Sequence, residues 1–232
     1  MIFAKVPLHY TKMTQPAAIN TKICGISTLE AARVAAREGA AFLGFIHFAK
    51  SPRHLTLDAM AALMQAIRDD GIVLPLVSVT VNPDEAQLTV LRDTVKPDMV
   101  QLHGHETPER VAEVKALTGL PVIKAISVSD AQDLVAAKAY EYSADYLLFD
   151  AKAPRDAAMP GGLGLSFDWT LLAGRQWQKP WFLAGGLDPD NAAEAVQISG
   201  AKSVDVSSGV ESAPGVKSTE LISRFLRNAK AL

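Results

Sequence analysis

The sequence contains very little cysteine: Cys24 is the only one among 232 residues. A single cysteine excludes an internal disulfide and any cysteine-based zinc site. Long apolar runs are missing as well, so no stretch is expected to span a bilayer. The first twenty residues lack a basic start followed by an apolar block, and we therefore expect no secretory signal and a cytoplasmic protein.

An excess of charge of either sign is also absent. The formal net charge is −2, which gives no electrostatic argument for a nucleic acid or an anionic membrane as a partner. Apolar residues are plentiful at 49% of the chain, which is enough for a sizeable core. The length fits one domain in the size range of α/β barrels. No long exposed apolar patch is marked in the sequence, and this favours a monomer.

One unit recurs from Asn20 onward: a short apolar run, a polar turn and an amphipathic helix rich in alanine. Strands are predicted over residues 21–26, 41–46, 74–81, 98–102, 121–126, 146–149, 181–184 and 203–206. Helices are predicted over 29–38, 57–68, 84–94, 108–117, 130–139, 167–173, 189–198 and 218–229. Eight such units predict a single α/β domain, a (β/α)8 TIM barrel over 20–232. Residues 1–19 form an N-terminal extension that could be disordered.

Two short apolar runs near the C-terminus stop abruptly at small residues. They lie within 183–187 and 201–211, and a helical pattern follows each. Glycine lets a backbone turn tightly and approach another group closely, and amides at the start of a helix favour an anion. Either turn alone reads as an ordinary connection, but two at the ends of the last two barrel strands indicate a phosphate site. The donors clustered there are the residues Ser207 and Ser208 and the amides of Gly185, Gly186, Gly209 and Val210.

Cys24 ends the first predicted strand and is a candidate general base. A thiol is a good base only when its pKa falls from about 8.5, so that thiolate is available. Side chains alternate along a strand, so Lys22 and Cys24 project to the same side and the cation could favour the thiolate. The alternative is a small buried hydrophobic residue, which is what most free cysteines are.

Polar residues at other strand ends extend this ring. Asp150 follows an apolar run, and apolar surroundings favour the protonated form of a carboxylic acid, so Asp150 is a candidate proton donor. A cap of the following loop is the alternative. Arg53 follows the second strand and could bind a carboxylate through two hydrogen bonds, or be an ordinary surface arginine. Gln101 and His103 end the fourth strand and are candidate substrate contacts.

Two patterns resemble a metal site or a cofactor site, but the rest of the sequence does not fit either kind of site. His103 and His105 form an H-x-H pair, yet the chain has only three other histidines and lacks the expected downstream ligands, so no metal is predicted. The glycines of 161–164 lie in a long loop and not between a strand and a long helix, so they are no dinucleotide fingerprint. Asp205, inside the last strand, is predicted to be structural.

The residues at these strand ends together resemble one family, the phosphoribosylanthranilate isomerases of tryptophan biosynthesis. The resemblance runs from residue 21 to the C-terminus and rests on seven motifs that are weak singly but occur in the right order. They are KICGI at 22–26, GF and SPR at 44–45 and 51–53, VQLHG at 100–104 with Glu106, LFD at 148–150, FDW at 167–169, LAGGL at 183–187 and VDVSSGVE at 204–211.

The resemblance implies a reaction and a set of roles. The reaction is an Amadori rearrangement of N-(5-phosphoribosyl)anthranilate, an aldose–ketose isomerisation classed as intramolecular oxidoreduction, without cofactor or metal. Cys24 matches the family's base, Asp150 its acid, and Arg53 the arginine that holds the anthranilate carboxylate. The family's phosphate site falls on Gly185, Gly186, Ser208 and Gly209, with neighbouring amides.

Three positions depart from the family's pattern and bear on loop closure and turnover: Leu163 replaces a usual threonine, Ser218 a common acidic residue and His47 a common aromatic one. Other functions stay open on the same fold. The related histidine-pathway isomerase would be expected to have an aspartate where Cys24 stands, and ribulose-phosphate epimerases would carry metal ligands that are missing here. A phosphate-binding protein without catalysis would keep only the glycine turns.

Overall fold

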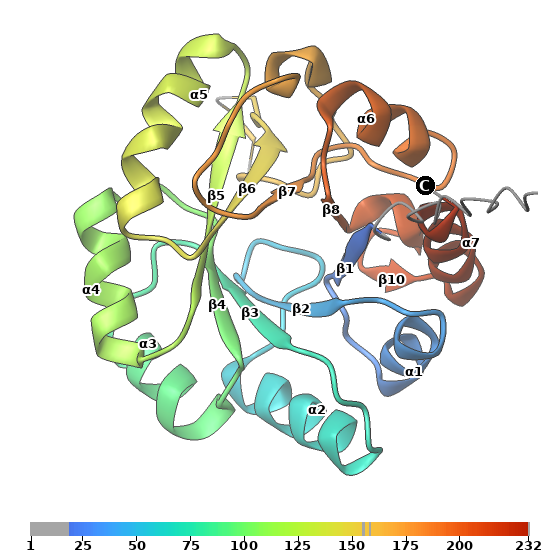
Figure 1. Cartoon of the computed structure of the whole chain (residues 1–232). Coiled ribbons are helices and arrows are strands. Elements are labelled where there is room, and N and C mark those ends of the chain that lie inside the picture. Colours follow the sequence, from blue (N-terminus) through green and yellow to red (C-terminus); the bar gives the residue numbers. More distant parts are fainter. Residues whose placement is uncertain (1–18, 155, 158, 232) are drawn as a thin grey trace, which may run out of the picture.

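A ring of parallel strands forms the centre of the protein, as seen in the computed structural model of residues 19–231, apart from 155 and 158 (Figure 1). The strands are β1 (Asn20–Cys24), β2 (Phe42–His47), β3 (Leu76–Thr80), β4 (Met99–Leu102), β5 (Val122–Val128), β6 (Tyr146–Ala151), β7 (Trp181–Leu183) and β8 (Ser203–Val206). Each strand pairs with the next, and β8 pairs with β1 to close the barrel. The predicted (β/α)8 barrel is therefore confirmed. The predicted extension over residues 1–19 lies almost entirely outside the described residues, and that boundary stays a prediction.

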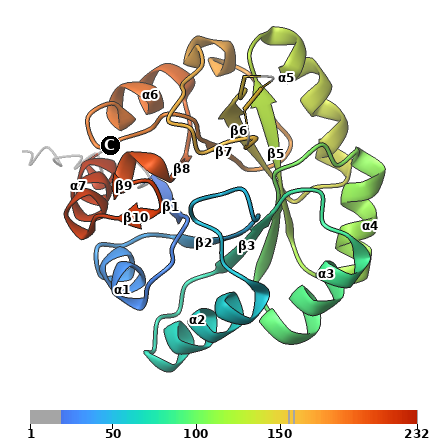
Figure 2. The ribbon, with the colours of Figure 1, turned by 180° about the vertical axis from the view of Figure 1, so that it is seen from behind.

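Helices surround the strand ring, and the reverse view in Figure 2 shows the same enclosure. They are α1 (Leu29–Arg37), α2 (Leu57–Asp69), α3 (Glu85–Val90), α4 (Pro108–Thr118), α5 (Ala131–Ala137), α6 (Ala192–Ser199) and α7 (Thr219–Lys230). Most begin at a residue whose side chain accepts a hydrogen bond from a free amide of the first turn: Thr28, Thr56, Asp84, Thr107, Asp130 and Ser218. None of the helices in the described part of the chain is long and apolar enough to cross a membrane.

Short irregular helices complete several units. A π-helical turn (Leu91–Val95) extends α3, and 3-10 turns follow α5 (Lys138–Tyr142) and replace the helix after β6 (Trp169–Leu172). The helices predicted over 84–94 and 130–139 are thus present in position but only partly α-helical, and the one predicted over 167–173 is a 3-10 turn.

The core has two layers that follow the alternation of side chains along each strand. Outward-facing strand residues pack against the helices in one large apolar cluster, to which Leu43, Val100 and Phe149 belong. Inward-facing residues form a smaller cluster inside the barrel. Its members are Val77, Met99, Ile123, Ala125, Leu148, Phe182 and Ala184.

A hairpin between β8 and α7 was not predicted. A 3-10 turn (Ser208–Val210) leads into the antiparallel strands β9 (Glu211–Ala213) and β10 (Val216–Lys217), so no long helix directly follows β8. The turn at Pro214 and Gly215, where Gly215 has φ +83°, reverses the chain. A Pro-Gly pair is a turn signal, and it was the available clue in the sequence.

A buried ion pair ties the loop after β4 to the outside of the barrel. Lys124 on β5 donates to Glu106 (Nζ to Oε2, 2.7 Å) and to the carbonyl of Gly104, while Glu106 accepts the backbone N–H groups of Asn82 and Gly104. Both charged side chains are at most 2% exposed. The carboxylate therefore fixes the backbone on which His103 is carried.

Replacement of Lys124 by methionine should destabilise the protein by about 3–5 kcal/mol, because the Glu106 carboxylate would stay buried without its cation. The measurement is equilibrium unfolding in urea. Arg37→Ala is the matched control, since Arg37 is 69% exposed in a 3.7 Å pair with Glu38 and should change stability by less than about 1 kcal/mol. Similar small losses for both variants would contradict this account of the buried pair.

Candidate active site

A cavity opens at the carboxyl ends of the barrel strands. Seven of the nine residues assigned to the site from the sequence line it: Cys24, Arg53, His103, Asp150, Gly185, Gly186 and Ser208. Gln101 is completely buried and contacts His103 from inside the barrel. Gly209 lies against the backbone of Leu187 and contributes to the turn behind Ser208. The structure thus gathers the predicted residues at one rim, as the barrel topology requires.

Cys24 shares its surroundings with a buried ion pair. Lys22 Nζ lies 2.8 Å from Asp205 Oδ1, and the two residues are register partners on β1 and β8. A methyl group added at Gly44 would lie 2.9 Å from Cys24 Sγ and 3.0 Å from Lys22 Nζ, so this glycine leaves the space in which thiol and ammonium meet. Lys22 and Cys24 project to the same side, as strand alternation predicts. Asp205, predicted to be structural, lines the cavity, and its role stays a prediction.

Burial is the largest influence on Cys24 and raises the pKa of its thiol above the ordinary value. The charge of Lys22 acts against burial, Asp205 acts with it, and Lys217 again lowers the pKa. The expectation that Lys22 favours the thiolate is therefore right in sign, but burial outweighs it. The charge of Lys22 is available, because Asp205 and Cys24 raise the pKa of Lys22 against the effect of its own burial.

Asp150 stands at the end of a directional chain of hydrogen bonds. Gln101 Nε2 lies 3.0 Å from His103 Nδ1, and His103 Nε2 lies 3.1 Å from Asp150 Oδ2. An amide nitrogen can only donate, so Nδ1 accepts and Nε2 carries the ring proton that is donated to Asp150. The backbone N–H of Ala151 donates to Oδ1 at 2.8 Å. Both oxygens of Asp150 are thus held by donors that stabilise its carboxylate form.

The loop after β6 crosses directly over this carboxylate. A methyl group added at Gly161 would lie 2.5 Å from Asp150 Oδ2 and 2.7 Å from His103 Nε2, so a larger residue would collide with the pair. Gly185, with φ +85°, approaches the same residue from β7, and its added methyl would lie 3.0 Å from Asp150 Oδ1. The glycines of 161–164 lie in the loop between β6 and the 3-10 turn Trp169–Leu172, and their packing role was not predicted from the sequence.

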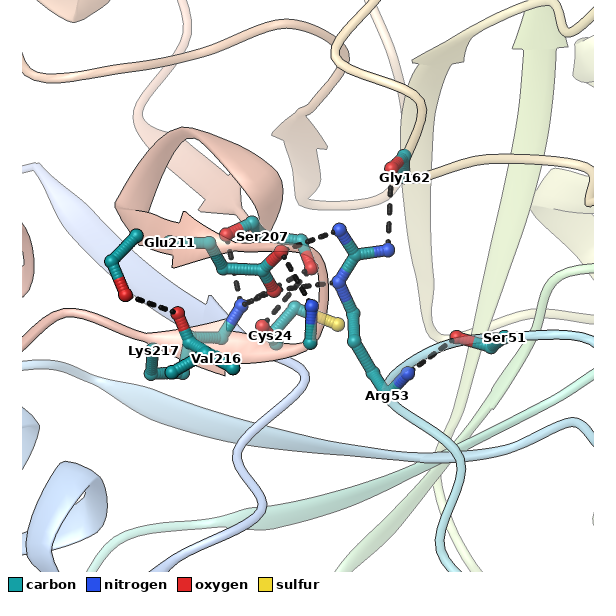
Figure 3. Close-up of polar contacts among 10 residues, drawn as sticks. Cys24, Ser51, Arg53, Gly162, Ser207, Glu211, Val216 and Lys217 are labelled. Atoms are coloured by element: carbon teal, nitrogen blue, oxygen red, sulfur yellow. Dashed lines mark hydrogen bonds and ion pairs between the residues drawn. The ribbon is translucent and has the colours of Figure 1, made fainter.

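Arg53 is buried and is not a surface arginine. Figure 3 shows its guanidinium held by Glu211: Nε and Nη2 donate to the two carboxylate oxygens at 2.7 and 2.8 Å. Nη1 donates to the carbonyl of Gly162 at 3.2 Å. A guanidinium has further N–H groups beyond these three contacts, and Arg53 lines the cavity, so it can still bind an anion there.

The glycine turns after β7 and β8 form the other end of the cavity. Gly186 has φ +64° and lies where a methyl group would be 2.9 Å from the backbone of Leu165. Gly209 leaves no room for a side chain next to the carbonyl of Leu187. These close contacts explain why both turns need glycine, and they leave Ser208 at the cavity wall.

The three departures from the family pattern lie in different places. Leu163 lines the cavity, whereas Ser218 caps α7 by accepting the N–H of Leu221. His47 contacts the carbonyl of Leu55 through Nδ1 and packs against the ring of His54. Only Leu163 of the three is therefore placed to touch a ligand in the cavity. Within the described residues, no group of three or more His, Cys, Asp or Glu side chains is arranged to hold a metal ion.

Comparison with known proteins decides the family. The family model for N-(5'-phosphoribosyl)anthranilate (PRA) isomerase matches residues 21–228. The chain belongs to this isomerase family. A relative with the same enzyme name from Paracoccus denitrificans is 52% identical over 214 residues, which cover 92% of this chain and 98% of that protein.

Solved structures of the family have the same fold. The isomerase from Thermotoga maritima superposes with a TM-score of 0.80 at 34% identity, covering 92% of this chain and all of that one. Another family structure, in complex with reduced 1-(o-carboxyphenylamino)-1-deoxyribulose 5-phosphate, has a TM-score of 0.75 at 31% identity over 92% of this chain and all of that one. A further solved structure is of monomers generated from the dimeric isomerase of Thermotoga maritima.

The hydrogen-bond chain predicts the tautomer of His103. Long-range proton–nitrogen NMR of the labelled protein should show the neutral ring with its proton on Nε2, because Gln101 can only donate to Nδ1. In Gln101→Glu, a carboxylate would face Nδ1 and should draw a proton onto that nitrogen at the same pH. The exposed ring of His105 serves as the internal reference. A proton on Nδ1 of the wild-type neutral ring would contradict the assigned direction.

Proposed function

We propose that this isomerase converts N-(5-phosphoribosyl)anthranilate to 1-(2-carboxyphenylamino)-1-deoxyribulose 5-phosphate by acid–base catalysis. The observation that carries the proposal is the shared cavity: the carboxyl of Asp150, the thiol of Cys24, the guanidinium of Arg53 and the two glycine turns line it together. An acid, a base and a binding group for each anionic end are what this substrate requires. The reaction is an intramolecular oxidoreduction, in which C2 of the sugar is oxidised and C1 is reduced.

Asp150 acts first, as general acid. It donates a proton to the furanose ring oxygen, the bond from C1 to that oxygen breaks, and the nitrogen lone pair forms a protonated Schiff base with C1. The carboxylate left behind is stabilised by His103 and by the N–H of Ala151, which already donate to its two oxygens. The same contacts hold the carboxyl group in place below the loop at Gly161.

Cys24 acts second, as general base. Its thiolate removes the proton from C2, and the electron pair moves through C1 to neutralise the nitrogen, which gives an enolamine. Tautomerisation of the enolamine yields the ketone at C2 and the amine at C1. Atoms and electrons balance within the substrate and the two side chains, and the mechanism as proposed uses no cofactor or metal.

Two binding groups orient the substrate between acid and base. Arg53 binds the anthranilate carboxylate through the N–H groups that its contacts with Glu211 and Gly162 leave over. The phosphate binds to the backbone amides and hydroxyl of the two turns formed by Gly185, Gly186, Ser208 and Gly209. The monomeric state and the cytoplasmic location expected from the sequence remain predictions of this proposal.

The acid and base roles can be tested by separate substitution. Cys24→Ala and Asp150→Asn should each lower kcat by about 10²-fold or more, because each removes one proton-transfer group. In the wild type, kcat/KM should fall as the pH drops through the raised pKa of the Cys24 thiol, since thiolate is the active form. Turnover is followed by anthranilate fluorescence, with the labile substrate made in situ by a phosphoribosyltransferase.

Asp58→Asn on the exposed outer side of α2 is the matched control and should leave kcat unchanged. Absence of wild-type turnover where a known family member is active would reject the proposed function. If Cys24→Ala or Asp150→Asn turned over as fast as the wild type, the role proposed for the replaced residue would be rejected.

The two binding ends can be separated with substrate fragments. Arg53→Met should weaken competitive inhibition by anthranilate about 10-fold or more, the loss expected for a charge-assisted contact, and leave inhibition by ribose 5-phosphate nearly unchanged. Ser208→Ala should weaken inhibition by ribose 5-phosphate and leave inhibition by anthranilate nearly unchanged. The factor should be smaller than for Arg53→Met. Inhibition constants from steady-state kinetics give the comparison, and equal weakening of both fragments by Arg53→Met would argue against a carboxylate-specific role.

A further inference from the structure

The hairpin β9–β10 carries a buried charge cluster that joins the separate parts of the active site. Glu211 on β9 binds Arg53 through both oxygens, and Lys217 on β10 donates to Glu211 (Nζ to Oε1, 2.7 Å). The side chains of all three are at most 4% exposed. Neither Glu211 nor Lys217 was assigned a role from the sequence.

Lys217 also binds the turn next to Cys24. Its Nζ donates to the carbonyl of Ser207 at 2.9 Å and lies 3.5 Å from the Ser207 hydroxyl. That hydroxyl donates to the carbonyl of Cys24 at 3.1 Å. A continuous path of hydrogen bonds therefore leads from Glu211 through Lys217 and Ser207 to the backbone of Cys24, as Figure 3 shows.

Gly25 shows how tightly this cluster is built against the end of β1. A methyl group at Gly25, which has φ +79°, would lie 2.8 Å from Arg53 Cδ and 3.3 Å from Lys217 Nζ. Any side chain directly after Cys24 would thus displace both cations. On the far side of the hairpin, Gly215 packs against the carbonyl of Pro52, next to Arg53.

We propose that Lys217 is a positioning residue for the general base: fixed by Glu211 and by the Ser207 carbonyl, its ammonium holds the β8 turn against Cys24 and supplies positive charge to the thiolate. The inference rests on the proposed role of Cys24. Lys22 cannot supply this charge alone, because Asp205 pairs with it at 2.8 Å. The cluster of Arg53, Glu211 and Lys217 contains two cations and one anion, and so keeps one net positive charge beside the thiol.

In the described part of the chain, few charged groups face Cys24 or Lys217. Cys24 is faced by Lys22 on its own strand, Asp205 on β8 and Lys217 on β10. Lys217 is faced by Glu211, Cys24 and Arg53. Burial lowers the pKa of Lys217, the charges of Glu211 and Cys24 raise it, and the charge of Arg53 lowers it further. Removing Lys217 leaves the neutral pairs Lys22–Asp205 and Arg53–Glu211, whereas removing the charge of Glu211 takes away the anion that keeps Lys217 charged.

The test is titration of the thiolate by its ultraviolet absorbance, in which Cys24 gives the only thiolate signal because it is the only cysteine in the chain. The same titration of Cys24→Ala gives the tyrosine background to be subtracted. Lys217→Met should raise the midpoint by about one pH unit, and Lys217→Arg should restore it to near the wild-type value. Glu211→Gln should also raise the midpoint, because Lys217 loses the anion that holds it and keeps it charged. A loss of packing alone would not be restored by Lys217→Arg.

Lys202→Met is the control for removal of one lysine charge, since Lys202 is exposed and precedes β8 at the opposite end of the barrel. The pH at which kcat/KM rises should shift in the same order. It should move to a higher value in Lys217→Met and return to near the wild-type value in Lys217→Arg. If Lys217→Met does not fold, Glu211→Gln carries the test.

An unchanged midpoint in folded Lys217→Met, equal shifts in Lys217→Met and Lys217→Arg, or an unchanged or lowered midpoint in Glu211→Gln would overturn the proposal. The thiolate titration needs no substrate. Failure of wild-type turnover would therefore reject the proposed function, while failure of the titration series would reject only the role of Lys217.

Discussion

Pairing between β1 and β8 closes the barrel, and the rest of the site depends on that closure. The two strands come from opposite ends of the chain, and their register sets Lys22 opposite Asp205. A closed parallel barrel places the carboxyl end of every strand at the same rim. Cys24, Asp150 and the two glycine turns therefore face one cavity although they are distant in sequence. Without closure Lys22 would lose Asp205, and Cys24 would lose the contact of its carbonyl with Ser207.

Buried charge is concentrated around this rim, and each charge has a partner. An unpaired charge in the interior is costly, whereas a paired and hydrogen-bonded one can be tolerated. Lys22 pairs with Asp205 inside the barrel, Lys124 with Glu106 behind the β4 loop, and Glu211 joins two cations beside β1. The deeper barrel interior is filled by apolar residues instead. Polar groups thus lie where backbone loops or reacting groups need to be fixed.

The sequence alone predicts the barrel well, because the strand and helix periods recur in eight units and local patterning reports burial directly. It also finds Cys24, Asp150, Arg53 and the glycine turns, since these stand at strand ends. It does not reveal that Glu211 and Lys217 fold back on a hairpin, because their contact depends on a turn and on tertiary packing. The direction of the Cys24 pKa shift likewise depends on competing burial and charge, which spacing cannot weigh.

The long sequence separation between Cys24 and its neighbours has a consequence for biosynthesis. β1 leaves the ribosome well before Ser207, which binds the Cys24 carbonyl and follows 183 residues later. Contacts of such separation form late and slow the folding of a chain. Until then the thiol has none of the β8 groups that surround it in the closed barrel. Its chemical reactivity is therefore a natural reporter of barrel completion, both on the ribosome and during refolding.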